Sequence, residues 1–149
     1  MVITSARDLI KFHEGCTLTA KPDTKGKWSI GYGHDIDPPA NEQASTCTQE
    51  AADQFFAADF LVACRDASRV LGVASFSVLS EPRKAALIDM AYELGESGLS
   101  EFQKMLGAVR GAFWSTARSE ALNSEWANEV PARAQMDATI LLTGEWPTV

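Results

Sequence analysis

Apolar and polar residues follow a helical rhythm at the start of this chain. Three apolar residues recur at helical spacing there: Leu9, Ile10 and Phe12. Ser5 precedes them as a candidate N-cap, and the acidic Asp8 follows it three residues later. Gly15 is a plausible stop. This pattern predicts a helix of about ten residues that ends at Glu14.

The rhythm then changes to that of a β-strand. Residues 17–19 favour an extended segment, and residues 22–26 (Pro-Asp-Thr-Lys-Gly) are typical of a turn. Apolar Trp28, Ile30 and Tyr32 alternate with small residues, which predicts a half-buried strand. The glycines between them fit either a β-bulge or the close approach of a ligand to the backbone. Residues 37–41 should end the sheet, because they contain two consecutive prolines.

Helical spacing dominates from Thr48 onward. Thr48 should cap a long helix that ends before Gly72 and measures about 35 Å, enough to link two lobes. Four more helices are expected: one opened by Ser80-Glu81-Pro82 and ended by Gly95, one capped by Ser100, one near 115–127, and one from Pro131 to Gly144.

These elements predict a mainly helical α+β fold in a single domain. The N-terminal helix and a small β lobe should occupy about 1–47, the interlobe helix about 48–71 and a helical lobe about 73–149. A length of 149 residues, with 46% apolar and 22% charged residues, is ordinary for one globular domain. The longest apolar run is about five residues, so neither membrane insertion nor a signal peptide is expected.

Charge and cysteine usage narrow the chemistry further. The chain has 13 basic and 20 acidic residues, a net charge of −7, which argues against nucleic acid or an anionic membrane as partner. Cys16, Cys47 and Cys64 form no CxxC pair, and only two histidines are present. We therefore expect free thiols in a reducing compartment, no metal site and no cofactor.

A pair of carboxylates offers the most specific chemistry. Glu14 ends a helix, where the macrodipole disfavours negative charge by about 0.3–1 kcal/mol and so favours a general acid. Asp23 could be an ordinary turn residue or the second carboxylate of a glycoside-cleaving pair. Ser29 could orient a water held by Asp23, or could be a plain surface residue. On position alone, an ordinary exposed glutamate at a helix end is the more common interpretation of Glu14.

The order of these residues resembles a known family. Glu14-Gly15, Asp23-Thr24 and Ser29-Ile30-Gly31-x-Gly33-His34 are similar to the motifs of the T-even bacteriophage lysozymes, the phage-type muramidases. The resemblance continues through Ala86-Leu87-Ile88-Asp89-Met90, Gly95-Glu96-Ser97-Gly98, Ser124-x-Trp126, Pro131-x-Arg133-Ala134 and Thr143-Gly144-x-Trp146. It spans nearly the whole chain, but residues 38–46 are fewer than in the family, as if a small helix were missing.

The resemblance implies a lysozyme-like fold and a catalytic pair. Glu14 would protonate the leaving glycosidic oxygen, Asp23 would activate the attacking water, and Ser29 would keep the hydroxyl of a family threonine. The reaction implied is inverting hydrolysis of the β-1,4 bond between N-acetylmuramic acid and N-acetylglucosamine.

It also implies glycan contacts at Gly33, Tyr92, Phe102 and Arg133. Arg133 would pair with Glu14 and lower its pKa, against burial and the helix dipole, and the sequence does not decide which effect prevails. His34 alone would be either a structural hydrogen-bond partner or a triad member, although no Gly-x-Ser-x-Gly elbow supports a triad. The resemblance favours a structural pair with Asp59.

The resemblance extends to partners and location. It implies a monomeric endolysin that binds peptidoglycan, is made in the host cytoplasm and reaches the cell wall through a holin. The acidic charge, with Gln135 and Met136 at basic family positions, predicts weak electrostatic steering toward an anionic wall. Two alternatives remain: a peptidoglycan-binding or tail-spike module without turnover, and a chitinase-like glycosidase.

Overall fold

A computed structural model describes residues 1–23, 25–39 and 45–149. In this part of the chain, eight helices accompany one small antiparallel sheet, which confirms the expected mainly helical α+β class. The predicted turn at 22–26, the sheet-ending segment at 37–41 and the shortened segment at 38–46 each lie partly outside the described residues.

The β lobe follows the first helix directly. Helix α1 (Ala6–Glu14) begins as predicted, because the Ser5 hydroxyl accepts a hydrogen bond of 3.1 Å from the Asp8 amide. The sheet has the order β1-β2-β3, with β1 at Thr17–Pro22, β2 at Trp28–Gly31 and β3 at His34–Ile36. Ile30 pairs with His34 across the β2–β3 hairpin.

The prediction of a continuous strand through Tyr32 was wrong. The chain turns at Tyr32 and Gly33 and returns as β3, which the sequence pattern did not reveal. A tertiary contact accounts for the difference, since the Tyr92 hydroxyl donates a hydrogen bond of 2.5 Å to the Tyr32 carbonyl. The turn is thus tied to the helical lobe.

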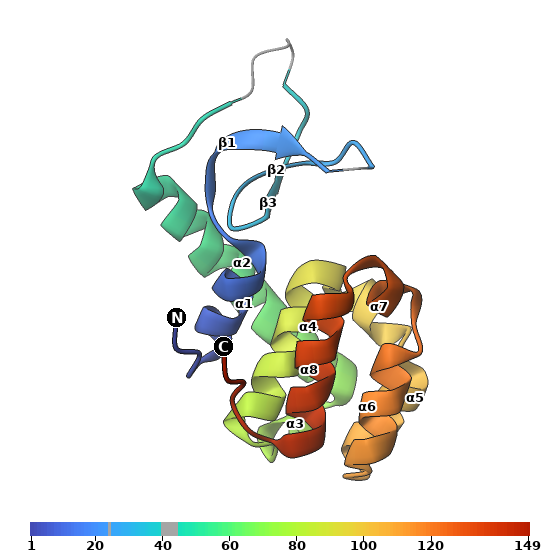
Figure 1. The fold of residues 1–149 in the computed structure, drawn as a ribbon. Helices are drawn as coiled ribbons and strands as arrows, with labels where there is room; N and C mark the ends of the chain where they lie inside the picture. Colours follow the sequence, from blue (N-terminus) through green and yellow to red (C-terminus); the bar gives the residue numbers. More distant parts are fainter. Residues whose placement is uncertain (24, 40–44) are drawn as a thin grey trace.

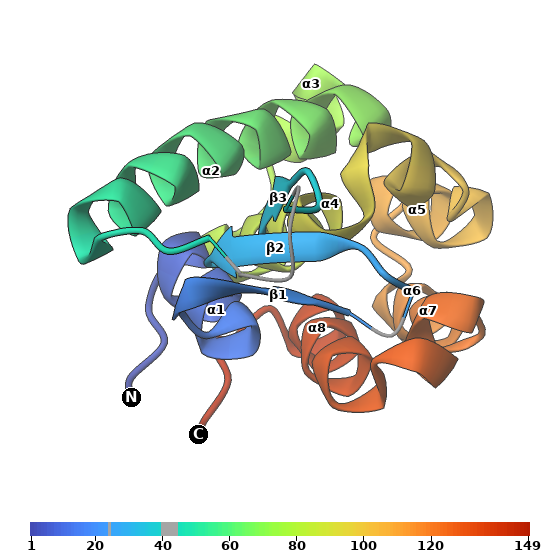
Figure 2. The same cartoon turned by 90° about the horizontal axis from the view of Figure 1, so that it is seen from above.

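Helix α2 (Gln49–Leu71) runs from the β lobe into the helical lobe (Figure 1). Thr48 caps it as expected, accepting a 3.1 Å hydrogen bond from the Ala51 amide. Seen from above, α2 runs along one side of the sheet while α8 (Pro131–Thr143) lies on the other (Figure 2). Phe56 and Phe60 turn toward the core from α2.

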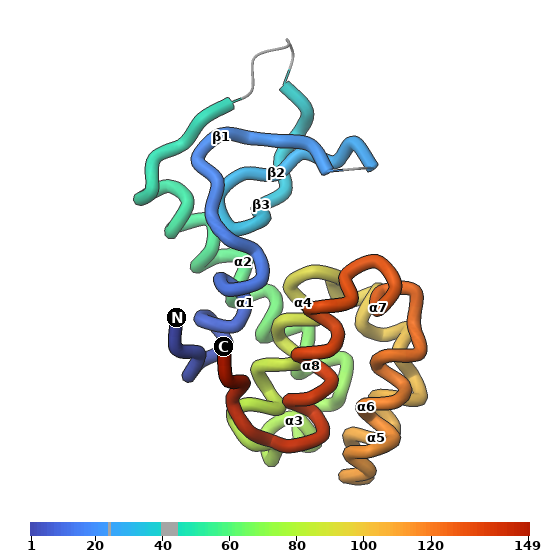
Figure 3. The backbone as a smooth tube through the Cα atoms, viewed as in Figure 1, coloured from blue at the N-terminus to red at the C-terminus, as the bar shows by residue number. Residues whose placement is uncertain are grey.

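The helical lobe contains α3 (Val73–Ser77), α4 (Glu81–Ser100), α5 (Gln103–Arg110), α6 (Trp114–Leu122), α7 (Glu125–Glu129) and α8 (Figure 3). Helix α4 packs against α1, α2 and α8 and supplies the centre of the core, with Leu87 and Met90 fully buried. Met136, which the pattern placed inside, is only half-buried. No helix in the described residues is both long and apolar enough to cross a bilayer.

Three helix boundaries in this lobe correct the sequence-based expectation. The backbone leaves the helical region at Gly95 (φ 72°), as expected of a stop, but another helical turn follows up to Ser100. Ser100 caps no helix, because its hydroxyl donates to the Ser97 carbonyl and Phe102 is the N-cap of α5. The single helix expected at 115–127 is two helices, since Ser124 caps α7. Helix α3 was not predicted.

Candidate active site

Glu14 and Arg133 form an ion pair at the junction of the lobes. Glu14 is the last residue of α1, and Arg133 lies in the first turn of α8. Arg133 Nη1 donates a 2.8 Å hydrogen bond to Glu14 Oε2, and the Arg133 side chain is only 8% exposed. The pairing agrees with the one the family resemblance implies, and it fixes the Glu14 carboxyl relative to the helical lobe.

Two further carboxylates surround the same guanidinium. Asp89, fully buried on α4, accepts hydrogen bonds of 2.9 and 2.8 Å from Arg133 Nε and Nη2. Glu93, one turn later on α4, lies 3.4 Å from Nη1. The planar fork of an arginine suits such two-bond recognition. Sequence reasoning missed Asp89 and Glu93, although Asp89 lies within an otherwise apolar helical stripe, which was the available signal.

The surroundings of Glu14 change the pKa of its carboxyl in opposite directions. The pKa of Glu14 is raised above its ordinary value of 4.5, first because burial penalises the charged carboxylate. The charge and hydrogen bond of Arg133 oppose this shift, while Glu93 and Asp89 add to it. The question left open by the sequence is thus answered: burial outweighs the arginine, and Glu14 retains its proton to higher pH than an exposed glutamate.

Gly33 makes room for the Glu14 carboxyl. Its backbone has φ +72°, and a Cβ added there would overlap Glu14 Oε1. Glycine is favoured here by the backbone conformation, since residues with a side chain disfavour this φ, and by the space that the Glu14 carboxyl occupies. The glycine pattern suggested that a ligand approaches the backbone closely, and here the Glu14 carboxyl approaches Gly33. A glycan contact at Gly33 stays a prediction.

Asp23 occupies an exposed turn with the opposite electrostatic character. Its Oδ1 accepts hydrogen bonds of 2.9 Å from the Lys27 amide and 2.8 Å from the Lys25 amide. These bonds, the one from Lys27 first, lower the pKa of Asp23 below 3.8. Lys25 Nζ also lies 3.4 Å from Glu129 Oε1 on α7, so the turn that carries Asp23 reaches the helical lobe. Asp23 is both a turn residue and an ionised carboxylate.

Ser29 sits in the middle of the sheet. It is half-buried on β2, paired with Lys21 on β1 and Asp35 on β3. Its role in orienting a water stays a prediction.

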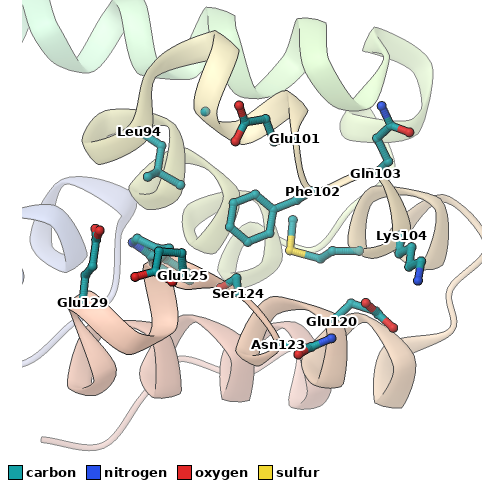
Figure 4. Close-up of a pocket in the computed structure, with 13 residues that line it drawn as sticks. Leu94, Glu101, Phe102, Gln103, Lys104, Glu120, Asn123, Ser124, Glu125 and Glu129 are labelled. Carbon is teal, nitrogen blue, oxygen red and sulfur yellow. The ribbon is translucent and has the colours of Figure 1, made fainter.

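Tyr92 and Phe102 line two different hollows. Tyr92, whose hydroxyl is engaged by the Tyr32 carbonyl, lines a cavity of about 200 Å³ together with Gly33 and His34. Phe102 lies in a larger cavity, about 610 Å³, between the end of α4 and helices α5, α6 and α7 (Figure 4). Both residues therefore border hollows on the surface, and their contact with a glycan stays a prediction.

The larger cavity is connected to Glu14 through side chains. Phe102 packs edge-on against Trp126, with ring centroids 6.0 Å apart. The Trp126 indole N–H donates to one oxygen of Glu93, whose other oxygen faces Arg133. A contiguous path thus leads from the cavity wall to the guanidinium that holds Glu14.

His34 has a structural partner, as expected. His34 Nδ1 and Asp59 Oδ2 are 2.7 Å apart, and the imidazole stacks on Phe55 with centroids separated by 4.3 Å. This confirms the predicted His34–Asp59 pair between the sheet and α2. The three cysteines are free, as expected.

Comparison with known proteins decides the family. The phage lysozyme family profile matches residues 11–137, most of the chain. The chain belongs to the phage lysozyme family. It is 26% identical to probable T4-type lysozyme 2 of Dictyostelium discoideum over 96% of both chains, and 24% identical to probable T4-type lysozyme 1 of that organism over the same share.

A third similar protein is much longer than this chain. The pre-baseplate central spike protein Gp5 of Enterobacteria phage T4 is 27% identical to it over 94% of this chain and 28% of Gp5. The match thus relates nearly all of this chain to a little over a quarter of Gp5.

Proposed function

We propose that this protein is a muramidase that hydrolyses the β-1,4 bond between N-acetylmuramic acid and N-acetylglucosamine in peptidoglycan, with inversion. One observation supports this most directly: within a phage lysozyme fold, the pKa of Glu14 is raised and that of Asp23 is lowered. Two carboxyls whose surroundings separate their pKa values in this way are suited to act as acid and base.

The proposed reaction uses each carboxyl once. Protonated Glu14 gives its proton to the glycosidic oxygen as the bond to the anomeric carbon breaks. Ionised Asp23 takes a proton from a water that attacks the opposite face of that carbon, with the Ser29 hydroxyl orienting the water. Such inversion requires room for the water, with carboxyls about 6.5–9.5 Å apart. Arg133 then stabilises the Glu14 carboxylate until solvent reprotonates it.

Substrate recognition in this proposal depends on shape and hydrogen bonds. Gly33, Tyr92 and Phe102 would contact the glycan. Arg133 would contribute through its hydrogen bond to Glu14. The net charge of −7 provides no long-range attraction for an anionic wall, so the lytic rate should depend only weakly on ionic strength.

The proposal includes the biology of an endolysin. The protein would act as a monomer on the cell wall, after synthesis in the host cytoplasm and release through a holin. The similarity to lysozymes named T4-type supports the enzymatic reading. The similarity to a central spike protein is what favours the alternative, a structural or peptidoglycan-binding module without turnover.

Cell lysis by matched variants tests the proposal. Clearing of outer-membrane-stripped bacteria is measured for the wild type, Glu14→Gln, Asp23→Asn and a control, Glu50→Gln, which changes an exposed glutamate at the start of α2. We expect clearing by the wild type and the control only, and no release of sugars from chitin. Equal clearing by Glu14→Gln would remove Glu14 as the acid, and binding of peptidoglycan without clearing by any of the proteins would support the structural module.

A further inference from the structure

Asp137 is a buried carboxyl without a partner. It lies one helical turn after Arg133 on α8 and is 0% exposed. Neither of its oxygens accepts a hydrogen bond from any residue that the structure describes. Three polar atoms lie within 4.8 Å of one another at this place: one carboxyl oxygen of Asp137, one carboxyl oxygen of Asp89 and one ring nitrogen of His13. A buried polar group in this state requires an explanation.

A single proton removes the repulsion between the two carboxyls of this cluster. Two ionised carboxylates so close together in a buried site repel each other, whereas one shared proton replaces the repulsion with a strong O–H···O⁻ hydrogen bond. Both Asp89 oxygens already accept hydrogen bonds from Arg133, which favours the ionised form of Asp89. The proton therefore belongs on Asp137.

The surrounding charges agree with this assignment. The ionisable groups around Asp137 are His13 from α1, Asp89 and Glu93 from α4, and Arg133 from α8. Helix α6, which also packs on α8, buries Ala117 and Ala121. Burial lowers the pKa of His13 below its ordinary value of 6.5, which favours the neutral ring. Burial first, and Asp89 second, raise the pKa of Asp137 well above 3.8.

A divalent cation is a less suitable occupant than a proton. The three residues offer a nitrogen and two carboxylates, which are known ligand types. However, both oxygens of Asp89 are engaged by Arg133, and a cation bound to Asp89 would lie beside the guanidinium. The resulting repulsion between two positive charges at short range disfavours the metal.

We propose that Asp137 is a positioning residue for Glu14: it stays protonated, donates to Asp89, and thereby keeps Asp89 aligned with the Arg133 fork that holds Glu14. The link to catalysis rests on the proposed function, but the proton on Asp137 does not. The chain of contacts is Asp137 to Asp89 to Arg133 to Glu14, from the interior outward.

The pH dependence of unfolding tests the proton directly. Because the pKa of Asp137 is raised on folding, the folded protein binds one proton more than the unfolded chain between about pH 5 and the folded pKa. The stability that this proton contributes is full below the unfolded pKa and is lost as the pH rises through the folded pKa. Asp137→Asn has no such proton. The unfolding constant of the wild type relative to that of Asp137→Asn should rise about tenfold per pH unit in this range. A ratio independent of pH, or a wild-type melting temperature that rises with Zn²⁺ or Mn²⁺ and falls with a chelator, would overturn the proposal.

Kinetics test the positioning role. Because Asn can still donate to Asp89, Asp137→Asn should leave the alkaline limb of the pH profile unshifted. Asp89→Asn makes the same change at the ionised partner. It removes a negative charge that raises the pKa of Glu14, so the alkaline limb should move to lower pH. Asp137→Leu, which lacks a donor, should lower kcat several-fold with little change in KM. Equal kcat for the Leu and Asn variants, or a limb shifted by Asp137→Asn, would contradict the role.

The two proposals fail in distinguishable ways. If Glu14→Gln lyses cells normally, the catalytic assignment fails, while the unfolding experiment still reports the proton on Asp137. If Glu14→Gln is inactive but Asp137→Asn leaves the pH dependence of unfolding unchanged, only the inference about Asp137 fails. If Asp137→Leu does not fold, Asp137→Asn and Asp89→Asn still decide the outcome.

Discussion

Arg133 and Asp89 are joined by two parallel hydrogen bonds of 2.9 and 2.8 Å between α8 and α4, with Asp89 fully buried. Replacing Arg133 with Met leaves a buried carboxylate without its cation, which should cost about 3–5 kcal/mol of stability. Adding Asp89→Asn to that variant should recover a large part of the loss, since the fully buried carboxylate is then also removed. Urea unfolding of the single and double variants measures this coupling, and additive effects would contradict it.

The pH profile of the proposed reaction should be unusually wide. The pKa of Asp23 lies below 3.8, so the acid limb should fall below that pH. The pKa of Glu14 lies above 4.5, so activity should persist above that pH before the acid deprotonates. Initial rates on a soluble glycan oligomer give both limbs. If the two limbs of the pH profile instead lay at the ordinary pKa values of aspartate and glutamate, the groups around Asp23 and Glu14 would not shift their pKa values during turnover.

The same shift of Glu14 has a consequence for stability. Because its pKa is raised on folding, the folded state binds more protons than the unfolded chain above about pH 4.5. Its contribution is therefore fully present below the unfolded pKa and is lost as pH rises through the folded pKa. Glu14→Gln should show a flatter dependence of melting temperature on pH than the wild type. Parallel curves would indicate that Glu14 titrates like an exposed residue.

Much of the fold could be predicted because its signals are local. Ser5 and Thr48 cap helices in the structure as they do in the sequence pattern. Strand β3 was missed because the turn before it depends on the distant Tyr92 hydroxyl. Ser100 was mistaken for a cap because its hydroxyl can equally bond back to its own helix, as it does with Ser97.

The candidate site was only partly predictable. Glu14, Asp23 and Arg133 were found through ordered motifs that resemble a family. Asp89 and Asp137 were not assigned a role, because a charged residue in a helix is ordinarily expected to face solvent. Only packing shows that both are buried beside Arg133, since three helices far apart in the sequence contribute to this cluster.

The His34–Asp59 pair should be structural. Asp59→Asn weakens the 2.7 Å hydrogen bond between β3 and α2 and should cost about 1–2 kcal/mol of stability. The lytic rate should remain close to normal, because neither residue contacts Glu14 or Asp23 in the proposed mechanism. Thermal melts at pH 5 and pH 8, paired with lysis assays, measure both. Loss of turnover with unchanged stability would refute the structural assignment.

Gly33→Ala should separate the geometry of Glu14 from general stability. The methyl group would overlap Glu14 Oε1, and the residue would be held at φ +72°, so we expect a loss of about 1–2 kcal/mol and a fall in kcat greater than any rise in KM. Gly107→Ala is the matched control. It lies inside α5, where an added Cβ meets nothing within 4 Å, and it should stabilise the protein by about 0.5–1 kcal/mol. If Gly33→Ala retains wild-type kcat, the Glu14 carboxyl does not need the space that this glycine provides.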